Sequence, residues 1–143
     1  MKFSTTASLI FVASILVATT LSACGAKSSD EQQVRALIDA VEAAAEARDT
    51  SDVLEHVADD YTDTDGLDRT QLQNLLRGYF LAHPKLELAV QIDSLEFPVD
   101  GLAQAVVSVT TVELTDPNLQ RLNVEFRRSG STWQVARAER VGR

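Results

Sequence analysis

Cysteine and proline are scarce in this sequence, which has one cysteine and three prolines among 143 residues. A single cysteine cannot pair within its own chain, so a disulfide framework is excluded. Low proline and glycine, with 45% hydrophobic residues, also exclude the collagen-like and disordered classes. Basic residues are outnumbered, 13 against 21 acidic ones, for a formal net charge of −8. Because nucleic-acid affinity depends largely on Lys and Arg that neutralise phosphates, we expect no nucleic-acid partner.

The longest apolar run, residues 9–18, lies near the N-terminus behind Lys2. As a helix it would span about 15 Å, half of a hydrocarbon core, which is typical of a signal peptide and too short for a membrane span. The residues that follow, Leu21-Ser22-Ala23-Cys24, resemble the lipobox of bacterial lipoproteins, in which the cysteine thiol receives a diacylglycerol. We therefore predict a signal peptide over residues 1–23, and a lipidated Cys24 with a short tether over residues 24–29.

The lipobox resemblance also implies a location and a partner. The partner is the lipid bilayer, held through acylated Cys24. Gly25 follows the cysteine where an aspartate would retain a proteobacterial lipoprotein in the inner membrane, so the resemblance implies the periplasmic face of the outer membrane. The alternatives to a lipoprotein signal are an ordinary secretory signal that contains a cysteine and an uncleaved N-terminal anchor.

Residues 30–143 are predicted to form a single domain that begins with three helices. Apolar residues recur at helical spacing from Val34 to Ala45, and Ser29 with Gln32, or Ser28 with Glu31, has capping-box spacing. A short second helix is predicted over Ser51–Ala58. A third opens at Asp68 and ends by His83, because Pro84 disfavours helix at the residue before it.

After Pro84 the hydrophobic period changes to two, which predicts strands. The alternation covers residues 86–97, with a bulge at Asp93-Ser94, and resumes over residues 102–114, from Leu122 to Phe126 and from Trp133 onward. Asp100-Gly101 and Ser129-Gly130 have the composition of hairpin turns. Helices followed by hairpins predict an α+β domain, an antiparallel sheet of about four long strands with helices on one face.

This order of elements resembles the nuclear-transport-factor-2-like, or SnoaL-like, fold. The resemblance rests on two helices, an acidic segment at residues 59–63, a third helix followed by His83-Pro84-Lys85-Leu86-Glu87-Leu88, and a final strand with Ser131-Thr132-Trp133-Gln134-Val135. It implies a cone, in which three helices pack on the concave side of a bent sheet around a pocket. It implies no activity, because this superfamily contains isomerases, dehydratases, cyclases and non-enzymatic binders.

No motif in the sequence specifies a reaction or a cofactor. Asp63, Asp65 and Gly66 fit an EF-hand loop, but its first and last ligand positions fall on Tyr61 and Leu72, so we predict no metal site. The two histidines are too few for a three-histidine zinc site. We expect neither a metal nor another cofactor.

The interior of the implied cone is the remaining candidate site. The residues predicted to line it are Tyr61, Asp63, Tyr79, Phe80, Phe126, Trp133 and Arg137. None matches the catalytic acid of the family's enzymes, so no catalytic residue is assigned. The sequence favours a non-catalytic domain that binds a small apolar ligand or a protein partner. The family resemblance implies that this partner can be a second copy, bound through the sheet. An isomerase, dehydratase or hydrolase that uses a pocket in the cone is the alternative.

Overall fold

The computed structural model describes residues 29–112 and 118–142, so the predicted signal peptide and lipidated Cys24 lie outside the described residues. The described part contains three helices and five strands. In chain order they are α1 (Asp30–Glu46), α2 (Thr50–Glu55), β1 (Val57–Asp63), α3 (Arg69–Ala82), β2 (Leu88–Val99), β3 (Leu102–Thr111), β4 (Asn118–Ser129) and β5 (Thr132–Arg140).

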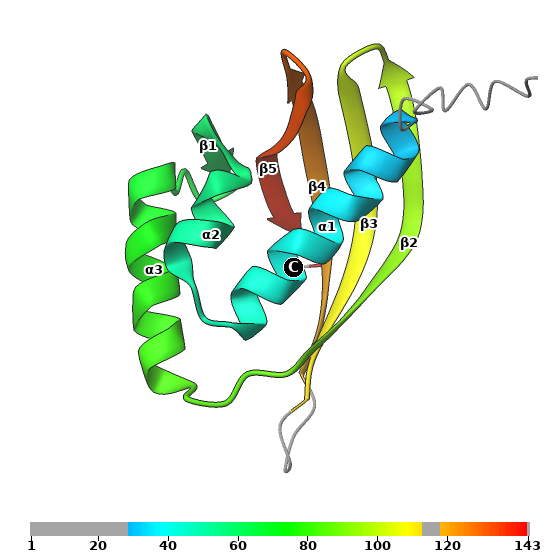
Figure 1. Ribbon diagram of the computed structural model, residues 1–143. Coiled ribbons are helices and arrows are strands. Elements are labelled where there is room, and N and C mark those ends of the chain that lie inside the picture. Colours follow the sequence, from blue (N-terminus) through cyan, green and yellow to red (C-terminus); the bar gives the residue numbers. More distant parts are fainter. Residues whose placement is uncertain (1–28, 113–117, 143) are drawn as a thin grey trace, which may run out of the picture.

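The strands form one twisted sheet in the order β1-β5-β4-β3-β2, and the helices lie on one side of it (Figure 1). Helix α1 crosses this side diagonally, while α2 and α3 lie beside the β1 edge. Strands β2 to β5 pair antiparallel as consecutive neighbours, and β1 pairs parallel with β5. The expected α+β architecture is therefore present.

The expectation of about four strands and of a second helix reaching Ala58 was wrong. Helix α2 ends at Glu55, and the acidic segment after it belongs to a fifth strand, β1. Two adjacent aspartates, Asp59 and Asp60, are exposed on this strand and hide its alternation in the sequence. The strand is stabilised by pairing with β5, more than 70 residues away, as Val57 pairs with Val135.

The helix boundaries depend on local capping, which the sequence predicted well. Ser29 Oγ accepts a hydrogen bond from the Gln32 N–H, and Gln32 Oε1 accepts one from the Ser29 N–H, which completes a capping box. Asp68 and Gln71 form the same reciprocal pair at the start of α3. Helix α3 ends with His83 as its C-cap, directly before Pro84.

The predicted bulge and hairpin turns are also confirmed, and one strand is longer than predicted. The register of β2 against β3 shifts between Ile92 and Ser94, as a bulge at Asp93 requires. Gly101 and Gly130 adopt positive φ in the two hairpin turns, where a glycine avoids steric strain. Strand β4 is longer than expected, because pairing with β3 continues to Asn118.

The main core lies between α1 and the sheet. Val34, Leu37 and Ile38 of α1 pack against a surface made by β3, β4 and β5. Alanines at positions 103 and 105 of β3 are almost fully buried, and their small side chains let the helix lie close to the sheet. Phe126, 1% exposed, and Trp133, 3% exposed, fill the rest of this space.

Candidate binding surfaces

The helix-covered side of the sheet is filled by packed apolar side chains. Besides the cluster under α1, a second cluster joins Ala44, Val53, Phe80 and Leu86, and a third joins Leu54, Val57 and Tyr61. Among the described residues, no polar or charged side chain is buried. This interior therefore resembles a packed core.

Trp133 is the one residue of this interior with an unused polar atom among the described side chains. Its indole Nε1 is buried and makes no hydrogen bond with any described residue. The ring of Phe97 packs edge-on against the indole at a centroid distance of 6.0 Å. The guanidinium carbon of Arg128 lies 5.5 Å from the indole centroid, within range of a cation–π contact.

Tyr61 is 6% exposed and lies in the third cluster, under α2. Burial, with nearby Asp63 as a second cause, raises the pKa of the Tyr61 phenol to about 12. The phenol therefore stays protonated at neutral pH and does not act as a base there.

The other candidates from the sequence lie in separate places. Asp63 accepts a hydrogen bond from the Leu67 N–H at 2.7 Å and so stabilises the turn before α3. Tyr79 is 38% exposed and stacks on His83, whereas its neighbour Phe80 is buried in the second cluster. Arg137 lies on the opposite side of the sheet and pairs with Glu139. Of the seven candidates, the structure brings only Phe126 and Trp133 into one cluster.

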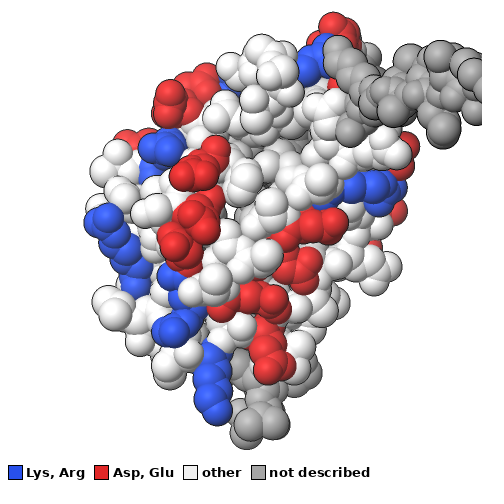
Figure 2. All heavy atoms as spheres, in the orientation of Figure 1, with Lys and Arg blue, Asp and Glu red and all other residues white. Residues whose placement is uncertain are grey.

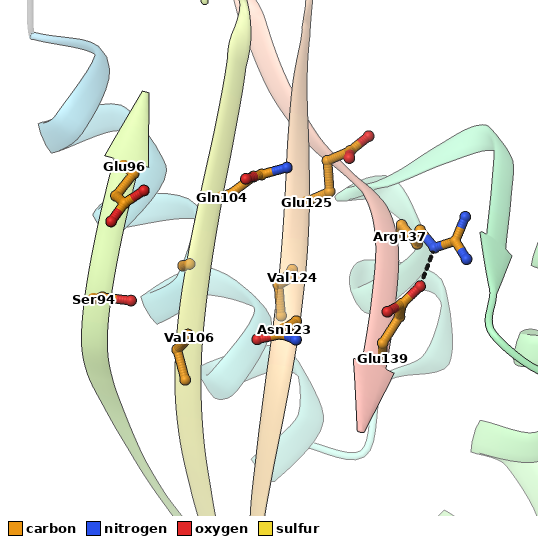
Figure 3. A pocket seen from close by; sticks show the side chains of 10 residues that line it. Ser94, Glu96, Gln104, Val106, Asn123, Val124, Glu125, Arg137 and Glu139 are labelled. Carbon is orange, nitrogen blue, oxygen red and sulfur yellow. Dashed lines mark hydrogen bonds and ion pairs between the residues drawn. The ribbon is translucent and has the colours of Figure 1, made fainter. Parts of the chain in front are cut away.

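The uncovered side of the sheet, which we call the outer face, carries a hollow of about 500 Å³ (Figure 3). Its walls are mainly polar side chains from β2 to β5, and Val106 lies on β3 between Ser94 and Asn123. Its lining comprises Ser94, Glu96, Gln104, Ala105, Val106, Asn123, Val124, Glu125, Arg137 and Glu139. Of these residues, only Arg137 was among the site candidates predicted from the sequence.

Strand register brings the hollow together. Across β3 and β4, Gln104 pairs with Glu125 and Val106 with Asn123. On the next strand, Arg137 pairs with Glu125. Apart from Val106, these residues belong to the polar half of each alternating strand, which the sequence pattern alone assigns to solvent. The alternation that places these polar side chains on one face is visible in the sequence, but most polar strand faces of this kind only contact water.

A second hollow, of about 310 Å³, lies between β1 and the β4–β5 hairpin. Arg127 crosses it and donates two hydrogen bonds to the Asp60 carboxylate, each 3.0 Å long. These bonds lower the pKa of Asp60 and raise the pKa of Arg127. The pair fixes β1 to β4 across the intervening strand.

We expect Arg127→Gln to raise the pKa of Asp60 towards that of an ordinary carboxyl group. Because the folded-state pKa is lowered, the pair contributes stability above the ordinary carboxyl range, and this contribution is lost as pH falls through the lowered pKa. The effect on stability is small, since both side chains are largely exposed. A carboxyl-carbon NMR titration of both proteins measures the shift. An unchanged Asp60 titration would contradict the pairing.

Charge is distributed unevenly over the domain. Residues 30–68 contain thirteen acidic and two basic residues, whereas the rest of the domain is nearly balanced. Figure 2 shows Asp and Glu side chains gathered in a band over the side that carries α1 and α2. Within the described ranges, no group of three or more potential ligands is arranged to hold a metal ion. No described helix is long and apolar enough to cross a membrane.

Comparison with known proteins identifies the fold. No family model matches the sequence, and no curated protein does so either. Solved structures do match. A protein from Thiobacillus denitrificans, named as a calcium/calmodulin-dependent protein kinase type II association domain, is 22% identical, with a TM-score of 0.64 over 76% of this chain and 94% of that one.

Two further matches are described as NTF2-like proteins of unknown function. The one from Shewanella oneidensis is 14% identical, with a TM-score of 0.64 over 78% of this chain and 98% of that one. The one from Pseudomonas putida is 19% identical, with a TM-score of 0.63 over 79% and 86%. The domain has the nuclear-transport-factor-2-like fold. At these identities the likeness establishes the fold and leaves the activity open.

Proposed function

We propose that this chain is a lipid-anchored protein of the bacterial cell envelope whose domain binds a protein partner without catalysing a reaction. Acylated Cys24 holds it on the periplasmic face of the outer membrane, and the partner docks on the outer face of the sheet. The first candidate partner is a second copy of the chain.

One observation carries the binding part of this proposal. Packed apolar side chains occupy the helix-covered side, where the fold would otherwise offer a pocket, whereas the 500 Å³ hollow lies on the outer face. This face carries both charge signs, since Arg121 pairs with Asp93 and Arg137 pairs with Glu139. A surface of mixed charge can meet a two-fold-related copy of itself with opposite charges in contact. The similar protein from Thiobacillus denitrificans is named as an association domain, which agrees with this role.

Native mass spectrometry of residues 27–143 tests the partner, with Val106→Arg as the decisive variant. Val106 is a half-buried aliphatic side chain that lines the hollow on β3, one of its two inner strands, so an arginine there would place an uncompensated charge inside a docked interface. We expect the unchanged domain to give the mass of a dimer, and Val106→Arg to weaken the dimer by at least about tenfold.

The matched control is Leu75→Arg, which introduces the same charge on α3 at a residue that is 59% exposed. It should leave the dimer mass unchanged. A monomer mass for all three proteins, or a dimer that survives Val106→Arg, would contradict association through the outer face.

A small ligand inside the fold is the second candidate, because the buried Trp133 Nε1 has no hydrogen-bond acceptor among the described residues. A buried donor without a partner is unfavourable, and an acceptor atom on a ligand would satisfy it. The same mass spectra distinguish this role, since a retained small molecule would add its own mass to the monomer.

A further inference from the structure

At the end of the molecule where α1 begins, one arginine links three separate segments of the chain. Arg128 Nη1 donates a hydrogen bond to the Asp30 carboxylate, the first residue of α1, at 3.0 Å. Its Nη2 donates to the Asp100 carboxylate in the β2–β3 turn. The start of α1, the β2–β3 turn and the end of β4 therefore lie side by side (Figure 1, upper right).

Three consecutive apolar residues are exposed at this end, immediately before Asp100. We call Phe97, Pro98 and Val99 the apolar tip. Val99 is 61% exposed and Phe97 39% exposed, and Pro98 is exposed as well. Phe97 is held in place by its edge-on contact with the buried Trp133 indole, so the tip is supported by the core. Large apolar side chains that are exposed together at one end of a molecule are typical of an interaction site.

The length of the predicted tether indicates that the apolar tip faces the bilayer. Five extended residues reach about 17 Å from an acylated Cys24 to Ser29, which caps α1 beside the apolar tip. The opposite end of the domain is much farther away, because the twelve residues of β4 span roughly 40 Å. A chain anchored at Cys24 therefore keeps the end with the apolar tip next to the bilayer.

Charge at this end opposes such an approach only weakly. Anionic lipids repel carboxylates, but Asp30 and Asp100 share Arg128, and Glu31 pairs with Arg35 at 2.9 Å, so these five groups together keep only one negative charge. Two membrane contacts on one protein reinforce each other, as an acyl chain and an apolar or basic patch do.

We propose that the apolar tip rests in the interfacial region of the bilayer and orients the domain upright on the membrane. This inference rests on the proposed anchor at Cys24. With the tip against the lipid, the strands run away from the membrane, and both the outer face and the acidic band remain open to partners from the sides.

The experiment compares two exposed aliphatic positions at opposite ends of the sheet. Val99→Cys and Leu119→Cys replace side chains that are 61% and 65% exposed. Cys24 is the only cysteine of the sequence, and acylation blocks its thiol, so the new cysteine alone is labelled with the fluorophore NBD. The full lipidated chain is then reconstituted into vesicles of phosphatidylethanolamine and phosphatidylglycerol, and binding is measured by flotation.

We expect the label at Val99 to shift its emission to the blue and to be quenched by spin-labelled lipids, and the label at Leu119 to do neither. Flotation without a shift at Val99, or with equal shifts at both positions, would overturn the tip contact and leave the anchor intact. A blue shift that lipid-borne quenchers do not reach would indicate a protein contact and would also overturn the proposal. Loss of flotation itself would overturn the anchor and the tip contact together.

Discussion

Replacing Phe126 with alanine is expected to lower the free energy of unfolding by about 3–5 kcal/mol. Phe126 is 1% exposed and packs with Trp133 and the α1 residues Val34 and Leu37, so its removal leaves a cavity that the surrounding strands cannot close. Because small domains are stable by only about 5–15 kcal/mol, this one change removes a large share of the total.

Urea unfolding of residues 27–143, followed by Trp133 fluorescence, measures the Phe126 effect. Leu119→Ala is the matched control, since Leu119 lies on the same strand and is 65% exposed. We expect its effect to stay within about 0.5 kcal/mol. Equal losses for the two variants would mean that the space under α1 is not a packed core, and would favour a ligand pocket there.

Replacing Cys24 with serine is expected to abolish lipid attachment and to release the protein from the membrane. The serine hydroxyl cannot form the thioether that carries the diacylglycerol, and once the predicted signal peptide is removed no acyl chain or long apolar run remains to hold the domain stably. Incorporation of labelled palmitate and fractionation of membranes measure the two effects separately.

The control for Cys24→Ser is Ser22→Ala, which keeps the cysteine and a small residue before it. This variant should still incorporate palmitate. A Cys24→Ser protein that is labelled with lipid would refute the anchor. A protein that loses the label and stays on the membrane would instead point to a partner that holds it there if residues 1–23 have been removed, and to an uncleaved anchor at residues 9–18 if they have not.

The two parts of the proposed function concern different regions and can fail separately. The anchor depends on four residues of the lipobox, whereas partner binding depends on strand residues about 70 to 115 positions farther along the chain. The apolar tip connects the two, because it sets how the outer face is presented above the membrane. An upright domain leaves this face accessible to a neighbouring copy anchored in the same bilayer, where confinement to a surface raises the effective concentration.

The sequence determined the features that depend on local chemistry. Capping boxes at Ser29 and Asp68, the helix end at His83, the bulge at Asp93 and the glycine turns all follow from interactions within a few residues. The period-two alternation after Pro84 predicted which side chains of the strands face the helices, including Phe126 and Trp133.

Only the tertiary structure decided where distant residues meet. Strand β1 was missed because its pairing partner, β5, lies far along the chain and its own alternation contains Asp59 and Asp60. The candidate site also changed: a cone interior was expected from the resemblance, but Phe126 and Trp133 pack against α1, and Arg137 lies on the other side of the sheet. Polar residues of four strands form the outer hollow only after strand register aligns them, and register is a property of the assembled sheet.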